Sequence, residues 1–298
     1  MARLRAWAPW ETGLVKVARG CYAYIQRGGL NISNAGLIVG TEGCLGVDAL
    51  YVRPMTRAFQ RAIRRTTDSP VRRVVCTHHH ADHTLGLIWF GQNVEVIAHE
   101  NMDAEMRRAG LDLGHYREVN PEFAADLRGL TQRFPSVTFE GRMTLQLGAR
   151  RVELLHLGHA HTRGDVLVYL PDEEVLYTGD VCFNFVTPAT FDANIGNWIN
   201  VLERIRAMRV RTIVPGHGPV GDRRVLDEML GYFTLVRREA RRRFDAGMTA
   251  RRAAADIPLG DYARWQKPDR IEQTVLKLYQ EFRGHAGRGI SLQAARGG

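Results

Sequence analysis

The stretch THHHADH, residues 77–83, holds four histidines and one aspartate within seven positions. The preceding run VRRVVCT, residues 71–77, is rich in β-branched residues and predicts a short buried strand. Because extended backbone alternates side-chain direction, His78 and His80 are expected to face one way and His79 the other, toward solvent or behind the ligands. Two imidazoles on one side of the chain form half of a tetrahedral zinc site.

Candidate ligands for a second cation follow in the same stretch and at the ends of other predicted strands. Asp82 and His83 come after the chain turns, so they are expected to face elsewhere and to suit a second, harder cation. Three further candidates end or follow apolar runs: His161 in GHAHTRGD, Asp180 in EVLYTGD and His217 in TIVPGHG. Open sheets gather functional groups at the carboxyl ends of their strands. The sequence therefore predicts a site for two metal ions.

These motifs, in this order, resemble the signature of the metallo-β-lactamase superfamily over about residues 14–222, with Asp48 of GVDAL as the first element. The resemblance implies an α/β fold, a four-layer αβ/βα sandwich with a two-metal cleft at one edge of the paired sheets. It also implies the ligands: His78, His80 and His161 for one zinc, and Asp82, His83 and His217 for the second, with Asp180 bridging the two. Asp48 would orient a ligand without binding metal.

Two residues near the ligands need a separate interpretation. His159 is expected to be structural or to support a ligand, because the family positions are already filled and only His161 has the HTRGD context. β-Lactamases of the family usually carry cysteine where Asp180 stands, and Cys182 is expected to pack inward. This departure argues against β-lactam hydrolysis as the native reaction.

The expected reaction is metal-assisted hydrolysis of a thioester, an ester or a lactone. Two zinc ions about 3.5–4 Å apart would share a water and lower its pKa, so that a bridging hydroxide attacks the acyl carbonyl. Asp82 and Asp180 are the candidate catalytic residues, and Asp82 could orient the nucleophile or take its proton. No G-x-S-x-G motif is present to supply a serine nucleophile.

A narrower resemblance suggests a substrate. The stretches NISNAGLIVG, GVDAL, TGDVCFNFVTP and GHGPVG are similar to the metallo-β-lactamase-type thioesterase/cyclases of bacterial aromatic (type II) polyketide pathways, to about residue 284. This resemblance implies release of a polyketide from an acyl carrier protein, with or without ring closure. His79 and His159 depart from that group's pattern. Three phenylalanines either line a pocket for a flat acyl chain or belong to the core: Phe183, Phe185 and Phe191.

The net charge of +9 comes almost entirely from arginine, since 41 basic residues include only Lys16, Lys267 and Lys277 as lysines. An arginine-rich surface would suit an acidic carrier protein, but arginine codons of a GC-rich genome explain it equally well. A nucleic-acid-binding role is an alternative, although the arginine run at 237–243 falls on a predicted amphipathic helix and is expected to face solvent. The same fold would also suit a lactonase, a β-lactamase-like amidohydrolase, or a persulfide dioxygenase with a single iron.

The predicted elements support one catalytic core with an appendage. Strands joined by tight turns precede a helix that begins near Pro54, and a helix is expected over residues 100–108. Residues 110–135 are irregular with scattered apolar side chains, typical of a cap or of a surface excursion. The predicted units are a core over residues 1–222, a helical segment packed on it over residues 223–284 and a flexible tail over residues 285–298.

The remaining observations concern location and assembly. No apolar run approaches the roughly 20 residues of a membrane-spanning helix, and the N-terminus lacks the apolar region of a signal peptide. The four cysteines are far apart and are expected to be free, buried thiols in a reducing cytoplasm: Cys21, Cys44, Cys76 and Cys182. An oligomer is compatible with the sequence, which does not specify one.

Overall fold

Seven strands form the first of two sheets in a computed structural model that describes residues 10–26 and 32–290. The strands lie in chain order; β1 to β4 pair antiparallel, and β4 to β7 pair parallel. Their bounds are Gly13–Ala18 (β1), Cys21–Ile25 (β2), Ala35–Gly40 (β3), Gly43–Val47 (β4), Val71–Val75 (β5), Glu95–His99 (β6) and Val137–Phe139 (β7). The parallel half places the carboxyl ends of β4 and β5 side by side.

Five strands form the second sheet, in the order β12-β11-β10-β9-β8. All its pairs are antiparallel except β11 with β12, which are parallel and joined by the helix α5, Ile195–Arg206. The strands are Arg142–Leu147 (β8), Arg150–Leu155 (β9), Leu167–Leu170 (β10), Val175–Phe183 (β11) and Thr212–His217 (β12). Here too, the one parallel pair brings two carboxyl ends to one edge.

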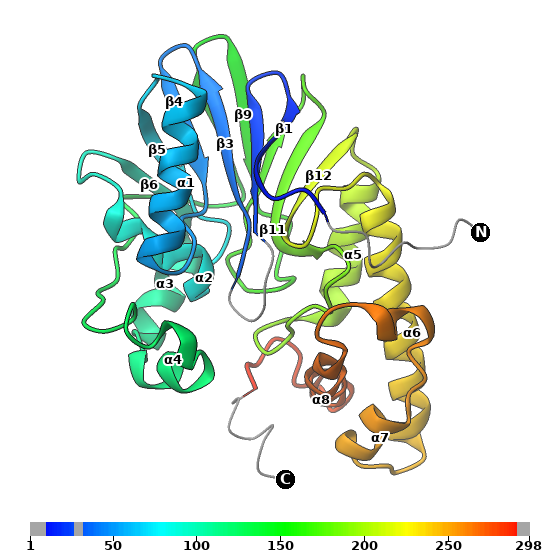
Figure 1. Ribbon diagram of the computed structural model, residues 1–298. Helices are drawn as coiled ribbons and strands as arrows, with labels where there is room; N and C mark the ends of the chain where they lie inside the picture. Colours follow the sequence, from blue (N-terminus) through cyan, green and yellow to red (C-terminus); the bar gives the residue numbers. More distant parts are fainter. Residues whose placement is uncertain (1–9, 27–31, 291–298) are drawn as a thin grey trace.

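The two sheets pack face to face through a shared apolar layer. Side chains such as Ile38 and Leu45 from the first sheet meet Val168 and Val214 from the second in one buried cluster. Helices cover both outer faces, with α1 on the first sheet and α5 and α6 on the second (Figure 1). This arrangement confirms the four-layer αβ/βα sandwich that the sequence predicted.

The helices beside the first sheet follow from local sequence. α1 begins at Arg53 with the predicted Pro54 in its first turn, and it buries Phe59 and Ile63. The helix expected over residues 100–108 is α3. The elements on this side are Arg53–Thr66 (α1), Ala81–Thr84 (α2), the 3-10 helix Leu85–Trp89 (η1), Glu100–Ala109 (α3), Leu113–Val119 (α4) and the 3-10 helix Pro121–Phe123 (η2).

The stretch expected to be irregular, residues 110–135, contains α4 and η2. α4 has only seven residues, none of them buried, which is too short a stretch for an apolar period to predict a helix. The half-buried side chains of this stretch pack on a small cluster around Tyr51, whose ring lies 6.2 Å from Tyr116 and 5.7 Å from Phe123. The stretch is thereby held against the chain that leads from β4 into α1.

The C-terminal helices share one hydrophobic core with the second sheet. In that cluster Trp198 of α5 packs against Phe233 of α6 at 4.8 Å, and Tyr232 stacks on Trp265 at 5.6 Å. The elements are Arg224–Asp245 (α6), Ala250–Asp256 (α7), the 3-10 helices Gly260–Arg264 (η3) and Pro268–Arg270 (η4), and Ile271–Phe282 (α8). One hydrophobic cluster thus joins the second sheet to the C-terminal helices, and the domain bounds expected from the sequence stay a prediction.

Part of the predicted tail lies against the body of the protein. The backbone N–H of Ile290 donates to Phe191 O at 2.9 Å, and Lys277 donates to the carbonyl of Arg288. Residues 291–298 lie outside the described residues.

All four cysteines are free and buried, which confirms this part of the cysteine prediction. Among the described residues, no helix has the length and apolarity needed to cross a membrane.

Phe233→Ala tests whether the C-terminal helices and the sandwich unfold together. Removing the ring leaves a cavity in the shared core, so we expect a loss of about 3–5 kcal/mol in the free energy of unfolding, in one transition. Denaturant unfolding followed by circular dichroism measures this, and the exposed Thr234→Ala on the same helix is the matched control. Two separate transitions in the wild type would contradict a shared core.

Candidate metal centre

The site lies where strand ends of both sheets meet. Asp48 directly follows β4, His78 follows β5 after two residues, and His217 ends β12. Asp180 lies within β11, where the pairing with β12 shifts register on either side of Gly179, and such irregularities redirect side chains. The backbone at Gly216 passes so close that a Cβ atom there would lie 1.9 Å from Asp180 Oδ1. Glycine at this position is therefore required for the carboxylate to enter the site.

A first cluster of ligand atoms combines three imidazoles with one carboxylate. His80 Nδ1 lies 3.1 Å from His78 Nε2 and 2.9 Å from His161 Nε2. Asp180 Oδ2 is 3.9 Å from His78 Nε2 and 3.4 Å from His161 Nε2. One ligand atom of each residue lies within 4.8 Å of the others, so together they can hold one metal ion.

A second cluster adjoins the first. His217 Nε2 lies 3.3 Å from Asp82 Oδ2, and His83 Nε2 lies 3.7 Å from the same oxygen. Asp180 reaches this cluster too, with Oδ1 at 3.2 Å from His83 Nε2 and Oδ2 at 3.3 Å from His217 Nε2. The seven predicted ligands thus come together in two groups with Asp180 between them, an arrangement that suits a bridging carboxylate.

Three imidazoles of the two clusters are held in place by hydrogen bonds at Nδ1. His83 Nδ1 bonds Asp48 Oδ2 at 2.7 Å, while His161 Nδ1 and His217 Nδ1 donate to the carbonyls of Ala189 and Ile32 at 3.1 and 3.0 Å. A histidine with one nitrogen donating in this way presents the lone pair of the other to a metal.

The predicted role of Asp48, orienting a ligand without binding metal, is supported by its contacts. Besides His83, its carboxylate accepts bonds from Thr77 N at 2.7 Å and Thr77 Oγ1 at 2.8 Å. Its φ of 61° lies in the left-handed region, which is costly for a residue other than glycine and persists only where surrounding contacts enforce it.

Two buried atoms show that the donor set fits metal ions. His83 Nε2 and Asp180 Oδ1 are both fully buried and lie 3.2 Å apart, but their contact lacks hydrogen-bond geometry and neither atom has another partner among the described residues. Unpartnered buried polar atoms are rare in folded proteins because they lose hydration without compensation. Imidazole nitrogens and carboxylate oxygens that converge in this way match the ligands of zinc and of other divalent transition metals.

The pKa values of the histidines in the metal-free site also fit metal binding. Burial lowers the pKa of His161 to about 3, which keeps its lone pair available. Burial also acts on His217, but the negative charge of Asp180 and then of Asp82 outweighs it and raises the pKa to about 9. The pKa of His83 is raised well above its usual value for the same reason, with Asp180 the largest of its negative neighbours. A cation that binds here would displace these protons and neutralise the same carboxylates.

Asp192 contacts two histidines of the site and was not among the site residues predicted from the sequence. Its Oδ2 lies 3.0 Å from His80 Nε2, which turns His80 Nδ1 toward the first cluster, and 3.6 Å from His79 Nε2. His159 Nε2 lies 2.7 Å from the backbone carbonyl of Asp192, which agrees with a structural role for His159. Asp192 is 112 residues from His80 and has no motif of its own, so no signal in the chain connected the two.

His79 lies outside the two main clusters. Residues 77–79 form a bend rather than extended backbone, so the predicted alternation of side chains is not what separates His79 from its neighbours. It does form a third potential group with His80 and Asp192. In that group His80 would have to use Nε2, yet Nε2 is already bonded to Asp192 while Nδ1 faces the first cluster. We therefore assign His79 a supporting position.

The three phenylalanines have different environments. Phe183 is 1% exposed, belongs to the core and stacks on His217 with ring centroids 5.2 Å apart, so for this residue the core interpretation applies. Phe185 is half-buried and packs against the same core. Phe191 is half-buried and lies 4.7 Å from the ring of His80, which leaves it as a candidate for contact with a substrate.

Tyr116 of α4 lies close enough to the site for the charges of its carboxylates to act on the tyrosine hydroxyl. Burial, together with the negative charges of Asp82 and Asp192, raises its pKa to about 12. The hydroxyl is therefore protonated at neutral pH and can donate a hydrogen bond.

His79→Phe is expected to keep the wild-type metal content, because His79 contributes to neither main cluster. The matched variant His78→Phe removes an imidazole of the first cluster and should lose about one metal ion per chain. Metal analysis by plasma mass spectrometry after dialysis gives both values. A metal ion lost in His79→Phe but retained in His78→Phe would show that the assignment of the two side chains is wrong.

Comparisons with known proteins agree with this site. A family model described as the Metallo-beta-lactamase superfamily matches residues 28–217. A metallo-beta-lactamase type 2 from Bacillus cereus is 24% identical over 229 residues, which covers 72% of this chain and 81% of that protein. An acyl-coenzyme A thioesterase from Bos taurus is 23% identical over 211 residues, covering 63% of this chain and 73% of that protein.

Solved structures share the fold. A metallo-beta-lactamase from Pontibacter korlensis superposes with a TM-score of 0.62 at 21% identity, over 75% of this chain and 99% of that one. The sec-alkylsulfatase Pisa1 from Pseudomonas sp. superposes with a TM-score of 0.70 at 19% identity, over 92% of this chain and 50% of that one. With the family model spanning well over half of its length and the His/Asp clusters in place, the chain belongs to the metallo-β-lactamase superfamily and is a hydrolase of that superfamily.

Proposed function

We propose that this protein is a dinuclear zinc-dependent hydrolase that cleaves acyl thioesters. The observation that carries the proposal is the pair of adjoining ligand clusters with the Asp180 carboxylate between them. Two ions held in this way would lie close enough to act on one substrate. The similarity to an acyl-coenzyme A thioesterase supports the choice of substrate class.

Bound metal ions would polarise the acyl carbonyl and lower the pKa of water toward neutrality. The residues of the chain then have separate tasks. Asp82, whose pKa the charges of His83 and His217 lower to about 2 against the opposing effect of burial, is ionised and can accept a hydrogen bond that orients the attacking water. Phe191, beside His80, gives the acyl group an apolar contact.

Thioesters suit a site of this kind for a chemical reason. The leaving thiolate has a conjugate acid with a pKa near 8.5, so it departs with less help from a general acid than an amine requires. The ligand set contains no cysteine, unlike the usual set of the β-lactamase group, and Cys182 is buried. Both points favour a thioester over a β-lactam as the native substrate.

The proposal extends to a carrier-bound acyl chain, as in polyketide release, with an acidic acyl carrier protein as partner. Support comes from the net charge of +9 and from exposed arginines along α6, among them Arg238, Arg241 and Arg242. Each of these arginines also contacts a carboxylate of the same helix, so part of the charge is balanced locally. The remaining positive charge would steer an acidic partner toward the protein.

A substrate panel on zinc-loaded protein tests the reaction class. Butyryl-N-acetylcysteamine should be hydrolysed, a chelator should abolish the activity and zinc should restore it. Asp180→Asn removes the shared carboxylate and should lower kcat/KM by at least about 100-fold, whereas the exposed Asp172→Asn should not. Rapid hydrolysis of a chromogenic cephalosporin with inert thioesters would overturn the thioesterase proposal.

A carrier-bound substrate tests the partner. The same acyl group on an acidic carrier protein should react with a higher kcat/KM than on N-acetylcysteamine, and the advantage should fall about tenfold as ionic strength rises. Replacing Arg237 and Arg238 by glutamate should reduce turnover of the carrier substrate alone. Equal salt dependence for both substrates would argue against docking of an acidic carrier.

A further inference from the structure

The loop that connects β11 to α5 lies against the imidazoles of the first cluster. This loop, residues 184–194, is called the Asp192 loop below. Its Ala189 carbonyl accepts a hydrogen bond from His161 Nδ1 at 3.1 Å, and Asp192 Oδ2 lies 3.0 Å from His80 Nε2. Two of the three imidazoles in the first cluster therefore take their orientation from the Asp192 loop.

Lys277 of α8 binds the backbone of the Asp192 loop beside the carboxylate. Its Nζ donates to Phe191 O at 3.3 Å and to the carbonyl of Arg288. The backbone N–H of Ile290 donates to the same Phe191 O at 2.9 Å. Phe191 directly precedes Asp192 in the chain. These hydrogen bonds therefore hold the part of the backbone that carries the Asp192 carboxylate.

Glu281, one helical turn after Lys277, holds the far end of the same loop. Its Oε1 accepts from Ile195 N at 2.5 Å and its Oε2 from Gly196 N at 3.1 Å. Residues four apart lie on one face of a helix, so one face of α8 contacts the Asp192 loop twice. The superfamily model matches residues 28–217 and stops before α8. This support for the first cluster is therefore an addition made by the C-terminal segment.

The environment of Lys277 is unfavourable for a lysine. The residue is 0% exposed, and none of the carboxylates in the described residues forms a salt bridge with it. Burial lowers its pKa, against the opposing charges of Asp192 and Glu281. Burying a charged group is costly, and ordering a long side chain also costs conformational entropy. An apolar side chain of similar volume is often neutral or stabilising at such a position. Stability alone would therefore favour methionine here.

We infer that Lys277 is a positioning residue for the metal ion held by the first cluster. It acts through the backbone of the Asp192 loop on the Asp192 carboxylate, which keeps His80 Nδ1 turned toward the cluster. Replacing a group that orients a metal-binding histidine typically weakens metal binding about 10- to 100-fold. The rings of the second cluster are oriented from outside this loop, by Asp48 and by the Ile32 carbonyl, so its ion should be affected less.

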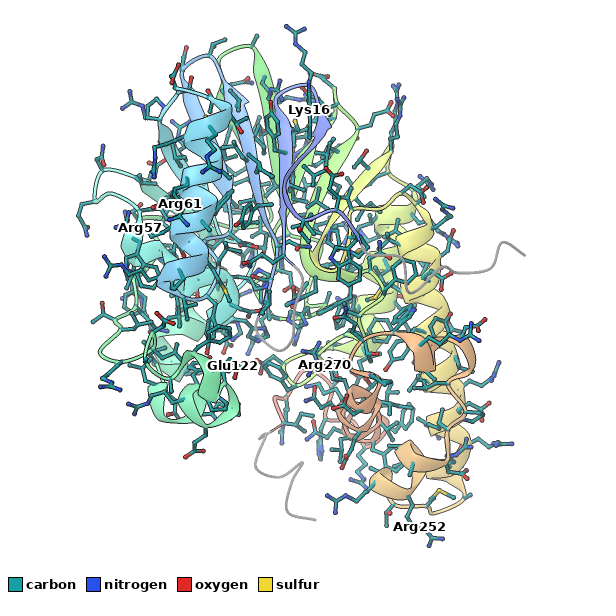
Figure 2. All side chains as sticks on the ribbon, in the orientation of Figure 1. Lys16, Arg57, Arg61, Glu122, Arg252 and Arg270 are labelled. Carbon is teal, nitrogen blue, oxygen red and sulfur yellow. The ribbon has the colours of Figure 1, made fainter. Side chains whose placement is uncertain are left out.

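Lys277→Met tests the inference, because methionine fills a similar volume without a hydrogen-bond donor. Competition titration of the metal-free protein with zinc and a chromophoric chelator gives the dissociation constant of each ion. One constant should rise about 10-fold or more, while the other should change less than about threefold. Lys16→Met is the matched control and should leave both constants unchanged. Lys16 is exposed, and Figure 2 labels it at the end of the sandwich opposite to α8.

A double variant shows whether Lys277 acts through Asp192. If it does, Lys277→Met should weaken binding far less when Asp192→Asn is already present, because the same support cannot be lost twice. Lys277→Gln keeps a hydrogen-bond donor on a shorter side chain and should bind the ion with intermediate affinity. It also supplies the same comparison if the methionine variant does not fold.

Thermal unfolding of the metal-free proteins separates positioning from a purely structural role. Lys277→Met should unfold at a temperature no lower than the wild type, because it removes a buried amine. A lower unfolding temperature with equal weakening of both ions would overturn the inference. Unchanged affinity for both ions, or additive effects in the double variant, would overturn it too.

The titration uses no substrate, so its result is independent of the reaction that the protein catalyses. If thioesters prove inert but Lys277→Met still weakens one ion, the proposed function fails and the inference stands. If the wild type binds a single ion, the dinuclear proposal fails, and the inference stands when Lys277→Met weakens that ion about tenfold.

Discussion

The buried carboxylate of Asp180 is the feature on which the rest of this structure depends. Four imidazoles approach its two oxygens at distances between 3.2 and 3.9 Å: His78, His83, His161 and His217. An ionised carboxylate inside a protein is costly unless positive charge or hydrogen bonds compensate it. The metal-free protein compensates it with protons on neighbouring histidines, and bound cations would take over that role. The fold must therefore hold several histidines around the Asp180 carboxylate. Neither sheet alone supplies all of these histidines.

The sandwich meets this requirement by bringing strand ends together. The parallel pair β4–β5 delivers Asp48 and the histidine cluster, while the parallel pair β11–β12 delivers Asp180 and His217. Gly216 leaves the space that the Asp180 carboxylate occupies. Side chains and carbonyls outside the ligand set then fix the ring orientations, because an imidazole that turned over would present the wrong nitrogen. The topology thus brings the side chains of the site together, and hydrogen bonds fix their orientations.

The superfamily model ends at residue 217, whereas the chain continues with the helices α6, α7 and α8. α6 and α8 share a core with the second sheet, so the C-terminal segment is anchored rather than loosely attached. Among the elements of the first sheet's side, α4 brings Tyr116 near the carboxylates of Asp82 and Asp192. Members of one superfamily share the metal chemistry of the core, and differences in such flanking segments are a physical basis for acting on different substrates.

The sequence by itself determined the ligand types and the fold class. Six of the seven predicted ligands lie in three recognisable motifs or directly beside them: His78, His80, Asp82, His83, His161 and His217. Asp180 was predicted at the end of an apolar strand, whereas β11 continues past it to Phe183. The contact of Asp192 with His80 and the place of Phe183 in the core became visible only in the folded chain. Those contacts join residues far apart in the chain, and they depend on how whole elements pack, which local patterns of residues do not encode.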